Sequence, residues 1–172
     1  MRFPVVPIAL SGVLASACVM PATQSATAPS RAYSPVGAFS RTEARIFDLI
    51  NSERGQRHLP LLVYNPQLDR MAKIQAEQMA TFQKMAHEIP QAELPTLADR
   101  AHRVGYVYGR IAENVALGYP TAEAVVEGWM TSRGHRENIL QRDVVETGIG
   151  VARSSAGGVY YCQVFGRRLR SF

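Results

Sequence analysis

The sequence predicts an α+β fold in which helices cover a small, mainly antiparallel sheet. Three observations lead to this prediction. Helical periodicity dominates the chain after residue 40, strand-like alternation comes mainly towards the C-terminus, and the last two strand patterns flank a Gly-rich turn at 154–158. Helices followed by a late antiparallel hairpin are typical of α+β domains. The length of 172 residues and the apolar content of 47% suit one domain preceded by a targeting segment.

The first two predicted helices are marked at their starts and along their buried faces. Residues 40–43 (Ser-Arg-Thr-Glu) fit a capping box, and an apolar face follows until the helix ends near Gly55. After a short link at 61–63, the pair Asn65-Pro66 places an N-cap residue and a first-turn proline at the start of the second helix. Leu, Met and Ala then recur at helical spacing up to Ala80, which predicts a buried stripe rather than a cofactor site.

Two shorter helices follow in the middle of the chain. Residues 97–104 carry a third apolar stripe, which ends at Gly105. Thr121 is placed to cap a fourth helix, whose apolar residues include the only tryptophan, Trp129, and fit the template of an amphipathic helix. Gly134 is the glycine expected at the C-terminal end of this helix.

Three strands complete the predicted domain. Residues 111–117, 145–151 and 159–165 alternate as strands do, and the last two form the hairpin. Cys162 lies in the final strand and is interpreted as a small buried apolar side chain. A disulfide with Cys18 in an oxidising compartment and a nucleophilic role are the alternatives, although no motif surrounds Cys162.

The N-terminus predicts export. Arg2, an apolar stretch at 3–13 that is too short for a permanent membrane span, and an A-x-A site at 15–17 are typical of a cleaved signal peptide covering 1–17. Cys18 follows at once. The residues up to Cys18 resemble a bacterial lipobox, although the usual leucine lies one position too far upstream.

Two outcomes therefore remain open for Cys18. Cleavage before it would release a soluble protein, whereas lipidation would anchor the protein to a membrane, which is the outcome we favour. Either way the predicted location is outside the cytoplasm, in the cell envelope, as a membrane lipoprotein or as a periplasmic or extracellular protein. The Pro-, Ala-, Ser- and Thr-rich segment 18–39 is predicted to be a disordered tether, or else an extended arm on the domain. The folded domain is expected at 40–166, with a basic tail at 167–172.

The charge pattern limits the classes of partner. The net charge is +5, and arginine supplies nearly all of the positive charge because Lys73 and Lys84 are the only lysines. The arginines are scattered except near the C-terminus, so the charge weakly favours anionic lipid headgroups or acidic wall polymers. No basic patch interleaved with aromatic residues occurs, and we therefore expect no nucleic-acid partner.

Three polar residues are the candidates for a functional site. His87 and His135 each lie at the edge of a predicted element, and Glu113 lies in an otherwise apolar strand, where an unpaired charge would be costly. Two imidazoles and a carboxylate would satisfy one another, and they are also ligands of divalent metals. The other two histidines, His58 and His102, are expected at the surface.

Five motifs follow one another in a recognisable order. They are His87, Ala112-Glu113-Asn114, Trp129-Met130-Thr131-Ser132-Arg133-Gly134-His135-Arg136-Glu137-Asn138-Ile139-Leu140, Thr147-Gly148-Ile149-Gly150-Val151 and Tyr160-Tyr161-Cys162-Gln163-Val164-Phe165-Gly166. In this order they resemble the CAP superfamily, which comprises cysteine-rich secretory proteins, antigen 5 and plant pathogenesis-related proteins, and in particular its bacterial, SCP-like secreted branch. The resemblance covers roughly residues 42–166.

The resemblance implies a three-layer α-β-α sandwich and a cleft lined by two histidines and two acids. His87 and His135 match the histidines of the family, and Glu113 matches one acid. Asn114 is expected to orient the strand and the cleft by hydrogen bonding. The second acid usually lies three residues after the tryptophan, where this chain has Ser132, which we interpret as a helix cap. The resemblance thus places these five residues in one binding cleft.

Three functions remain open. Family members have been linked to sterol, lipid and cell-wall interactions, which implies an exported binding module for a lipid, sterol or cell-envelope ligand. His87, Glu113 and His135 would also suffice as ligands of Zn²⁺ or another divalent metal with one open position, so a zinc-dependent hydrolase of peptides or wall polymers is an alternative. Against it, no HExxH helix and no separate general base is evident. In the third interpretation the three residues form a polar cluster that only stabilises the cleft.

Overall fold

The structure is a computed structural model that describes residues 40–169; the predicted signal peptide, Cys18 and the tether lie outside the described residues. The elements in chain order are α1 (Arg41–Gly55), β1 (Val63–Tyr64), α2 (Pro66–Phe82), α3 (Leu97–Val104), β2 (Tyr108–Leu117), α4 (Ala122–Thr131), α5 (Arg133–Ile139), β3 (Glu146–Arg153) and β4 (Val159–Arg168). None of the helices in this part of the chain is long and apolar enough to cross a membrane.

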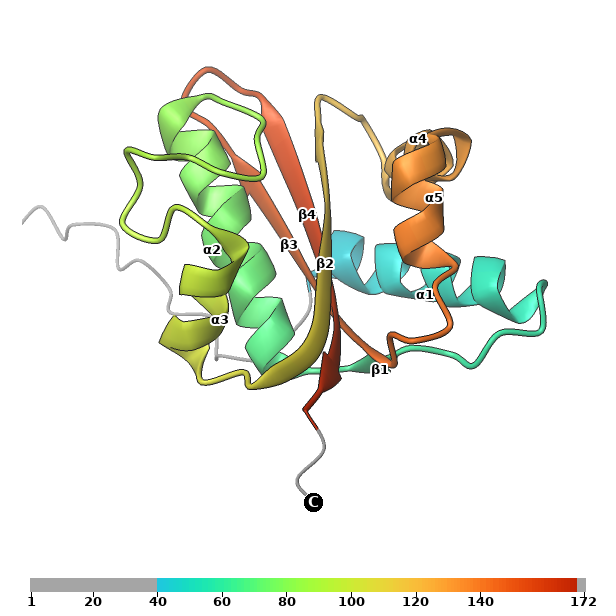
Figure 1. Ribbon diagram of the computed structural model, residues 1–172. Coiled ribbons are helices and arrows are strands. Elements are labelled where there is room, and N and C mark those ends of the chain that lie inside the picture. Colours follow the sequence, from blue (N-terminus) through green and yellow to red (C-terminus); the bar gives the residue numbers. More distant parts are fainter. Residues whose placement is uncertain (1–39, 170–172) are drawn as a thin grey trace, which may run out of the picture. The chain divides into compact units, whose positions relative to one another are not determined.

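The strands form one mixed sheet in the order β1-β3-β4-β2 (Figure 1). β3 and β4 make the predicted antiparallel hairpin, β2 pairs antiparallel with the other edge of β4, and the short β1 pairs in parallel with β3. The expected link at 61–63 contributes Val63 to β1. β4 continues through Arg168, two residues into the segment 167–172 that was predicted to be a tail.

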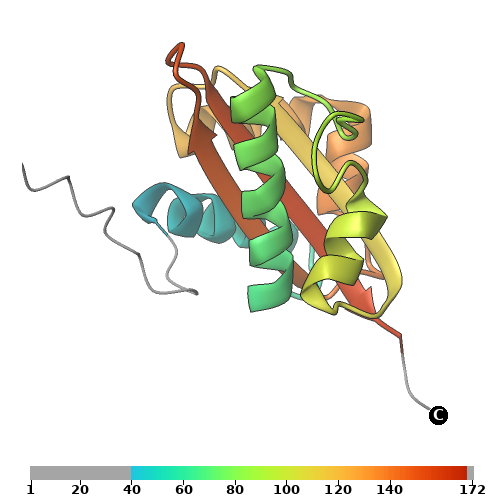
Figure 2. The same ribbon diagram turned by 90° about the vertical axis from the view of Figure 1, so that its left-hand side faces the viewer.

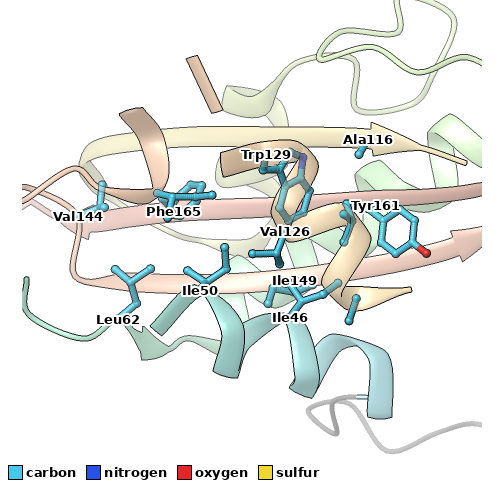
Figure 3. Packing of buried hydrophobic residues seen from close by; sticks show 13 residues of the cluster. Ile46, Ile50, Leu62, Ala116, Val126, Trp129, Val144, Ile149, Tyr161 and Phe165 are labelled. Carbon is cyan, nitrogen blue, oxygen red and sulfur yellow. The ribbon is translucent and has the colours of Figure 1, made fainter. Parts of the chain in front are cut away.

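Helices cover both faces of this sheet, so the domain is the predicted three-layer α-β-α sandwich. α2 and α3 lie on one face, and α1, α4 and α5 lie on the other (Figure 1). Figure 2 shows α2 running across β3 and β4. The core on the α2 side includes Met71 and Met79, and the core on the α1 and α4 side surrounds Trp129 and Phe165 (Figure 3). The buried methionine stripe is thus core, as predicted.

Two glycines let α2 lie directly on β3. A Cβ atom added to Gly148 would stand 1.9 Å from the backbone nitrogen of Asp69, and one added to Gly150 would stand 2.4 Å from the carbonyl carbon of Ala72. No real side chain fits in that space. These glycines therefore set the separation between the helix layer and the sheet, and with it the depth of the core on that side.

Most predicted helix ends are confirmed. Ser40 and Glu43 form the capping box, in which the Glu43 carboxylate accepts from the Ser40 backbone N–H at 2.7 Å. The Asn65 side chain accepts backbone N–H groups at the start of α2, and the Thr121 hydroxyl accepts one at the start of α4. Gly105 ends α3 in the left-handed conformation, with φ of 69°.

The end of the fourth helix differs from the prediction. α4 stops at Thr131, Ser132 is extended, and a separate helix, α5, follows, so that Gly134 lies inside α5 and is not the C-terminal glycine of α4. Ser132 occupies the cap position between α4 and α5, as interpreted, but its side chain makes no capping hydrogen bond. The break redirects the chain so that Ile139 is fully buried in the same core as Trp129. Burial of Ile139 thus prevails over the local helix-ending signal of a glycine.

Candidate functional site

Glu113 is the centre of the candidate site. It lies in β2, its side chain is only 3% exposed, and both carboxylate oxygens are engaged. Oε1 lies 3.0 Å from Nδ1 of His87, and Oε2 lies 2.7 Å from Nη2 of Arg100. The Sγ of Cys162, on the neighbouring strand β4, lies 3.4 Å from the same Oε2. The partner that the sequence reasoning required for Glu113 is therefore present, but it includes an arginine that this reasoning did not name.

Arg100 reaches Glu113 from α3 and is fully buried. Its Nη1 donates to Oε1 of Gln75 at 2.5 Å, and its Nη2 lies 3.5 Å from the backbone oxygen of His87. Its Nε is buried and has no hydrogen-bond partner among residues 40–169. The buried positive charge of Arg100 and the buried negative charge of Glu113 neutralise each other, which is the condition under which such charges are tolerated in a core.

His87 links this buried ion pair to the protein surface, because it contacts Glu113 and is itself exposed. The residue follows α2 in a loop, and its side chain is 57% exposed although Nδ1 contacts the buried Glu113. The hydrogen bond with Glu113 raises the pKa of the His87 imidazole, and the negative charge of Glu113 raises it further, while partial burial and Arg100 oppose the shift. His87 is thus a solvent-facing imidazole whose orientation is set by a buried carboxylate.

His135 lies in the first turn of α5 and behaves differently. Burial lowers the pKa of its imidazole, and the charge of His87 lowers it further. Among the described residues, the His135 ring is not a hydrogen-bond partner of the Glu113 carboxylate. The structure therefore brings His87 and Glu113 into direct contact, whereas the His135 ring does not join the pair.

Asn114 ties His135 to the sheet. Asn114 is fully buried in β2, its Nδ2 donates to the backbone oxygen of His135 at 3.1 Å, and its Oδ1 accepts from Nδ2 of Asn138 at 2.9 Å. Asn138 also donates to the backbone oxygen of Glu113 at 3.3 Å. These bonds hold α5 against β2, which matches the orienting role expected for Asn114.

Neither Cys162 nor Ser132 is placed as a reactive side chain in this site. Cys162 is buried and free, and burial raises the pKa of its thiol well above the usual value, so that it stays a thiol rather than the nucleophilic thiolate. It is a buried side chain, as predicted. Ser132 is half-buried at the junction of α4 and α5.

The metal prediction can be compared with this geometry. Across residues 40–169, no group of three or more His, Cys, Asp or Glu side chains is placed to hold a metal ion. The two oxygens of Glu113 face an imidazole and a guanidinium instead. The three side chains thus do not form a ready ligand group in this arrangement, and a divalent metal at His87, Glu113 and His135 stays a prediction, as does the zinc-dependent hydrolase built on it.

The sequence reasoning missed Arg100, Gln75 and Asn138. One signal could have found Arg100, because it stands three residues after Leu97 and four before Val104, on the apolar stripe of α3. A charged residue on a buried stripe needs a buried partner of opposite charge. Glu113 is the acid in the apolar strand that follows. A buried arginine and a buried glutamate in neighbouring elements could therefore have been paired with each other.

Comparisons with known proteins give this fold and site a family context. The model of the cysteine-rich secretory protein (CAP) family matches residues 47–165. The uncharacterized protein YkwD of Bacillus subtilis (strain 168) is 31% identical over 128 residues, which are 74% of this chain and 48% of YkwD. The uncharacterized membrane protein YlbC of the same organism is 31% identical over 127 residues, which are 74% of this chain and 35% of YlbC. The chain thus spans less than half the length of these curated relatives.

Solved structures agree with the fold. An extracellular protein containing an SCP domain from Bacillus anthracis str. Ames matches with a TM-score of 0.68 and 31% identity, over 74% of this chain and 40% of that one. An outer surface protein from Borrelia burgdorferi matches with the same TM-score, over 77% of this chain and 97% of that one. Its identity of 20% shows a shared fold alone.

Proposed function

The chain belongs to the cysteine-rich secretory protein (CAP) family, and from that premise we propose that it is an exported binding module that holds its ligand at the surface around His87 and His135. The ligand is a lipid, a sterol or a cell-envelope polymer. The observation that carries the proposal is the contact between His87 and Glu113. The imidazole of His87 is 57% exposed, whereas the Glu113 carboxylate that it contacts is only 3% exposed.

That contact prepares His87 for recognition. Glu113 engages Nδ1, so Nε2 is the ring nitrogen that remains for a ligand, and no described residue hydrogen-bonds it. Because the orientation of the ring is already set, a ligand loses less conformational freedom when it binds. His135, with its lowered pKa, supplies a neutral ring. The raised pKa of His87 favours the protonated ring, in which Nε2–H can donate to a ligand oxygen, and the neutral ring of His135 suits a less polar part of the ligand.

The ligand class follows from this chemistry. Phosphate headgroups, sterol hydroxyls and wall-polymer oxygens all accept hydrogen bonds from an imidazole N–H. The net charge of +5 favours the anionic members of this group. The matching Bacillus anthracis protein is described as extracellular and YlbC as a membrane protein, which supports a setting at the cell envelope.

Binding measurements on matched histidine variants test the proposal. Wild type, His87→Ala and His102→Ala are compared in sedimentation with phosphatidylglycerol vesicles, with sterol-containing vesicles and with purified wall polymer. His102 is the control because it is an exposed histidine on α3. We expect one of the three probes to bind, at least tenfold weaker binding by His87→Ala, and unchanged binding by His102→Ala. Equal binding by all three proteins would remove His87 from any binding site.

Export and anchoring are separate parts of the proposal. The signal peptide at 1–17 directs the chain out of the cytoplasm, and lipidation of Cys18 holds it at the membrane. Metabolic labelling with palmitate, followed by membrane fractionation, compares wild type with Cys18→Ala. Loss of label and release from the membrane fraction are expected in the variant. Label that persists in Cys18→Ala would sink the lipoprotein assignment without touching the binding site.

A further inference from the structure

We infer that Arg100 is the resident cation of this site: its guanidinium neutralises the Glu113 carboxylate, and through Glu113 it positions His87 without any divalent metal. The inference deepens the proposed function and rests on it for the purpose of positioning His87.

Both oxygens of the Glu113 carboxylate already face a cationic or imidazole partner from this chain. Oε1 faces Nδ1 of His87 at 3.0 Å, and Oε2 faces Nη2 of Arg100 at 2.7 Å. A metal that replaced the contact at Oε1 would compete with Nδ1 of His87, the imidazole that was predicted to be its fellow ligand. A metal that bound Oε2 would displace Arg100 and leave a fully buried guanidinium without its counter-charge, which is strongly unfavourable.

Arg100 is also fixed from its other side. Nη1 donates to Oε1 of Gln75 at 2.5 Å, and Nη1 also lies 3.5 Å from the backbone oxygen of Leu94. Gln75 in turn donates from Nε2 to the backbone oxygen of Ala86 at 2.6 Å. A dedicated buried acceptor on α2 therefore holds the guanidinium, so Arg100 does not merely fill space beside an acid.

Gln75 and Arg100 also contact the main chain of the loop that carries His87. Nε2 of Gln75 lies 3.3 Å from the backbone oxygen of His87, and Nη2 of Arg100 lies 3.5 Å from that oxygen. Arg100 thus acts on His87 twice, through the Glu113 carboxylate on the ring and through the main chain. A monovalent cation attached to the protein performs the orienting work of a metal, but it cannot be removed by a chelator.

Calorimetric titration of Zn²⁺ into the full exported chain tests the inference. We expect no difference between wild type and the His87→Ala/His135→Ala double variant, because the wild-type site takes no zinc. Arg100→Met removes the charge at similar length, and we expect it to bind Zn²⁺ at least tenfold more tightly than wild type. Adding His87→Ala to Arg100→Met should abolish that gain.

Two results would overturn the inference. One is wild-type Zn²⁺ binding that weakens at least tenfold in the histidine double variant. The other is a folded Arg100→Met protein that binds Zn²⁺ no better than wild type. If Arg100→Met does not fold, NMR of the wild-type His87 ring decides: ring signals unmoved by Zn²⁺ support the inference, and signals that move refute it. Loss of vesicle or polymer binding in His87→Ala tests the proposed function independently, because it does not depend on zinc.

Discussion

Removal of the Glu113 carboxylate is the sharpest test of the buried ion pair. In Glu113→Leu the guanidinium of Arg100 remains fully buried, with Gln75 as its remaining side-chain partner. A buried charge that loses its partner typically costs about 3–5 kcal/mol of unfolding free energy. A further change, Arg100→Met, removes the stranded charge. The double variant should therefore recover most of the loss, because apolar replacement of a whole buried pair is often neutral or stabilising.

The assay is urea unfolding followed by the fluorescence of Trp129. This tryptophan is the only one in the chain and is almost fully buried, so its emission reports global unfolding. With an m-value of about 2 kcal/mol/M, a loss of about 4 kcal/mol lowers the urea midpoint by about 2 M. The control is Glu123→Leu, which breaks the surface ion pair between Glu123 and Arg45. Both of these side chains are about half exposed. The control should move the midpoint far less.

Two outcomes would refute the reasoning. Glu113→Leu could shift the midpoint no more than the surface control does. Alternatively, the double variant could be no more stable than Glu113→Leu alone. In either case Arg100 and Glu113 would not be one energetic unit, and the account of the site as a neutralised buried pair would fail.

The remaining predictions concern packing, capping and pH. Gly148→Ala should lower the free energy of unfolding by about 3 kcal/mol or more, measured by urea unfolding, because its Cβ would lie 1.9 Å from the α2 backbone. Gly134→Ala has nothing within 4 Å of the added Cβ, so it should be neutral or stabilising by about 0.5–1 kcal/mol. A clear loss of stability in Gly134→Ala would restore the interpretation of Gly134 as a helix end. Asn138→Ala should lose about 1–3 kcal/mol in the same assay, since it leaves a buried acceptor unpaired. The raised pKa of His87 stabilises the fold fully below its unfolded value of about 6.5 and less as pH rises through the folded value, whereas the lowered pKa of His135 costs stability as pH falls below about 6.5. His87→Ala should thus remove a decline in stability above that pH, and His135→Ala a decline below it; unchanged pH profiles in both variants would contradict these signs.

The sequence by itself determined the elements and the fold class. Caps such as Ser40 and Asn65 and the buried stripes they precede are local features, because they depend on residues within a few positions of one another. The hairpin of β3 and β4 is equally local, since one short turn joins its strands. The order of these elements, together with motifs that resemble the CAP family, was enough to predict an α+β sandwich.

The tertiary structure alone decided two features. The first is the course of 132–140, where the local signal of Gly134 yields to the burial of Ile139 in a core shared with distant elements. The second is the make-up of the site. His87, Glu113 and Arg100 come from a loop, a strand and a helix, and which of them touch depends on how these elements are brought together in space.

The physical reason lies in the range of the forces that each pattern encodes. Helical periodicity and capping follow from hydrogen bonds and side-chain contacts within a few residues, so a sequence displays them directly. The partner of a buried charge is set by packing and electrostatics between elements, and a sequence shows only that such a partner must exist. The position of Glu113 in an apolar strand showed that a partner was needed, and the packed structure shows that this partner includes Arg100.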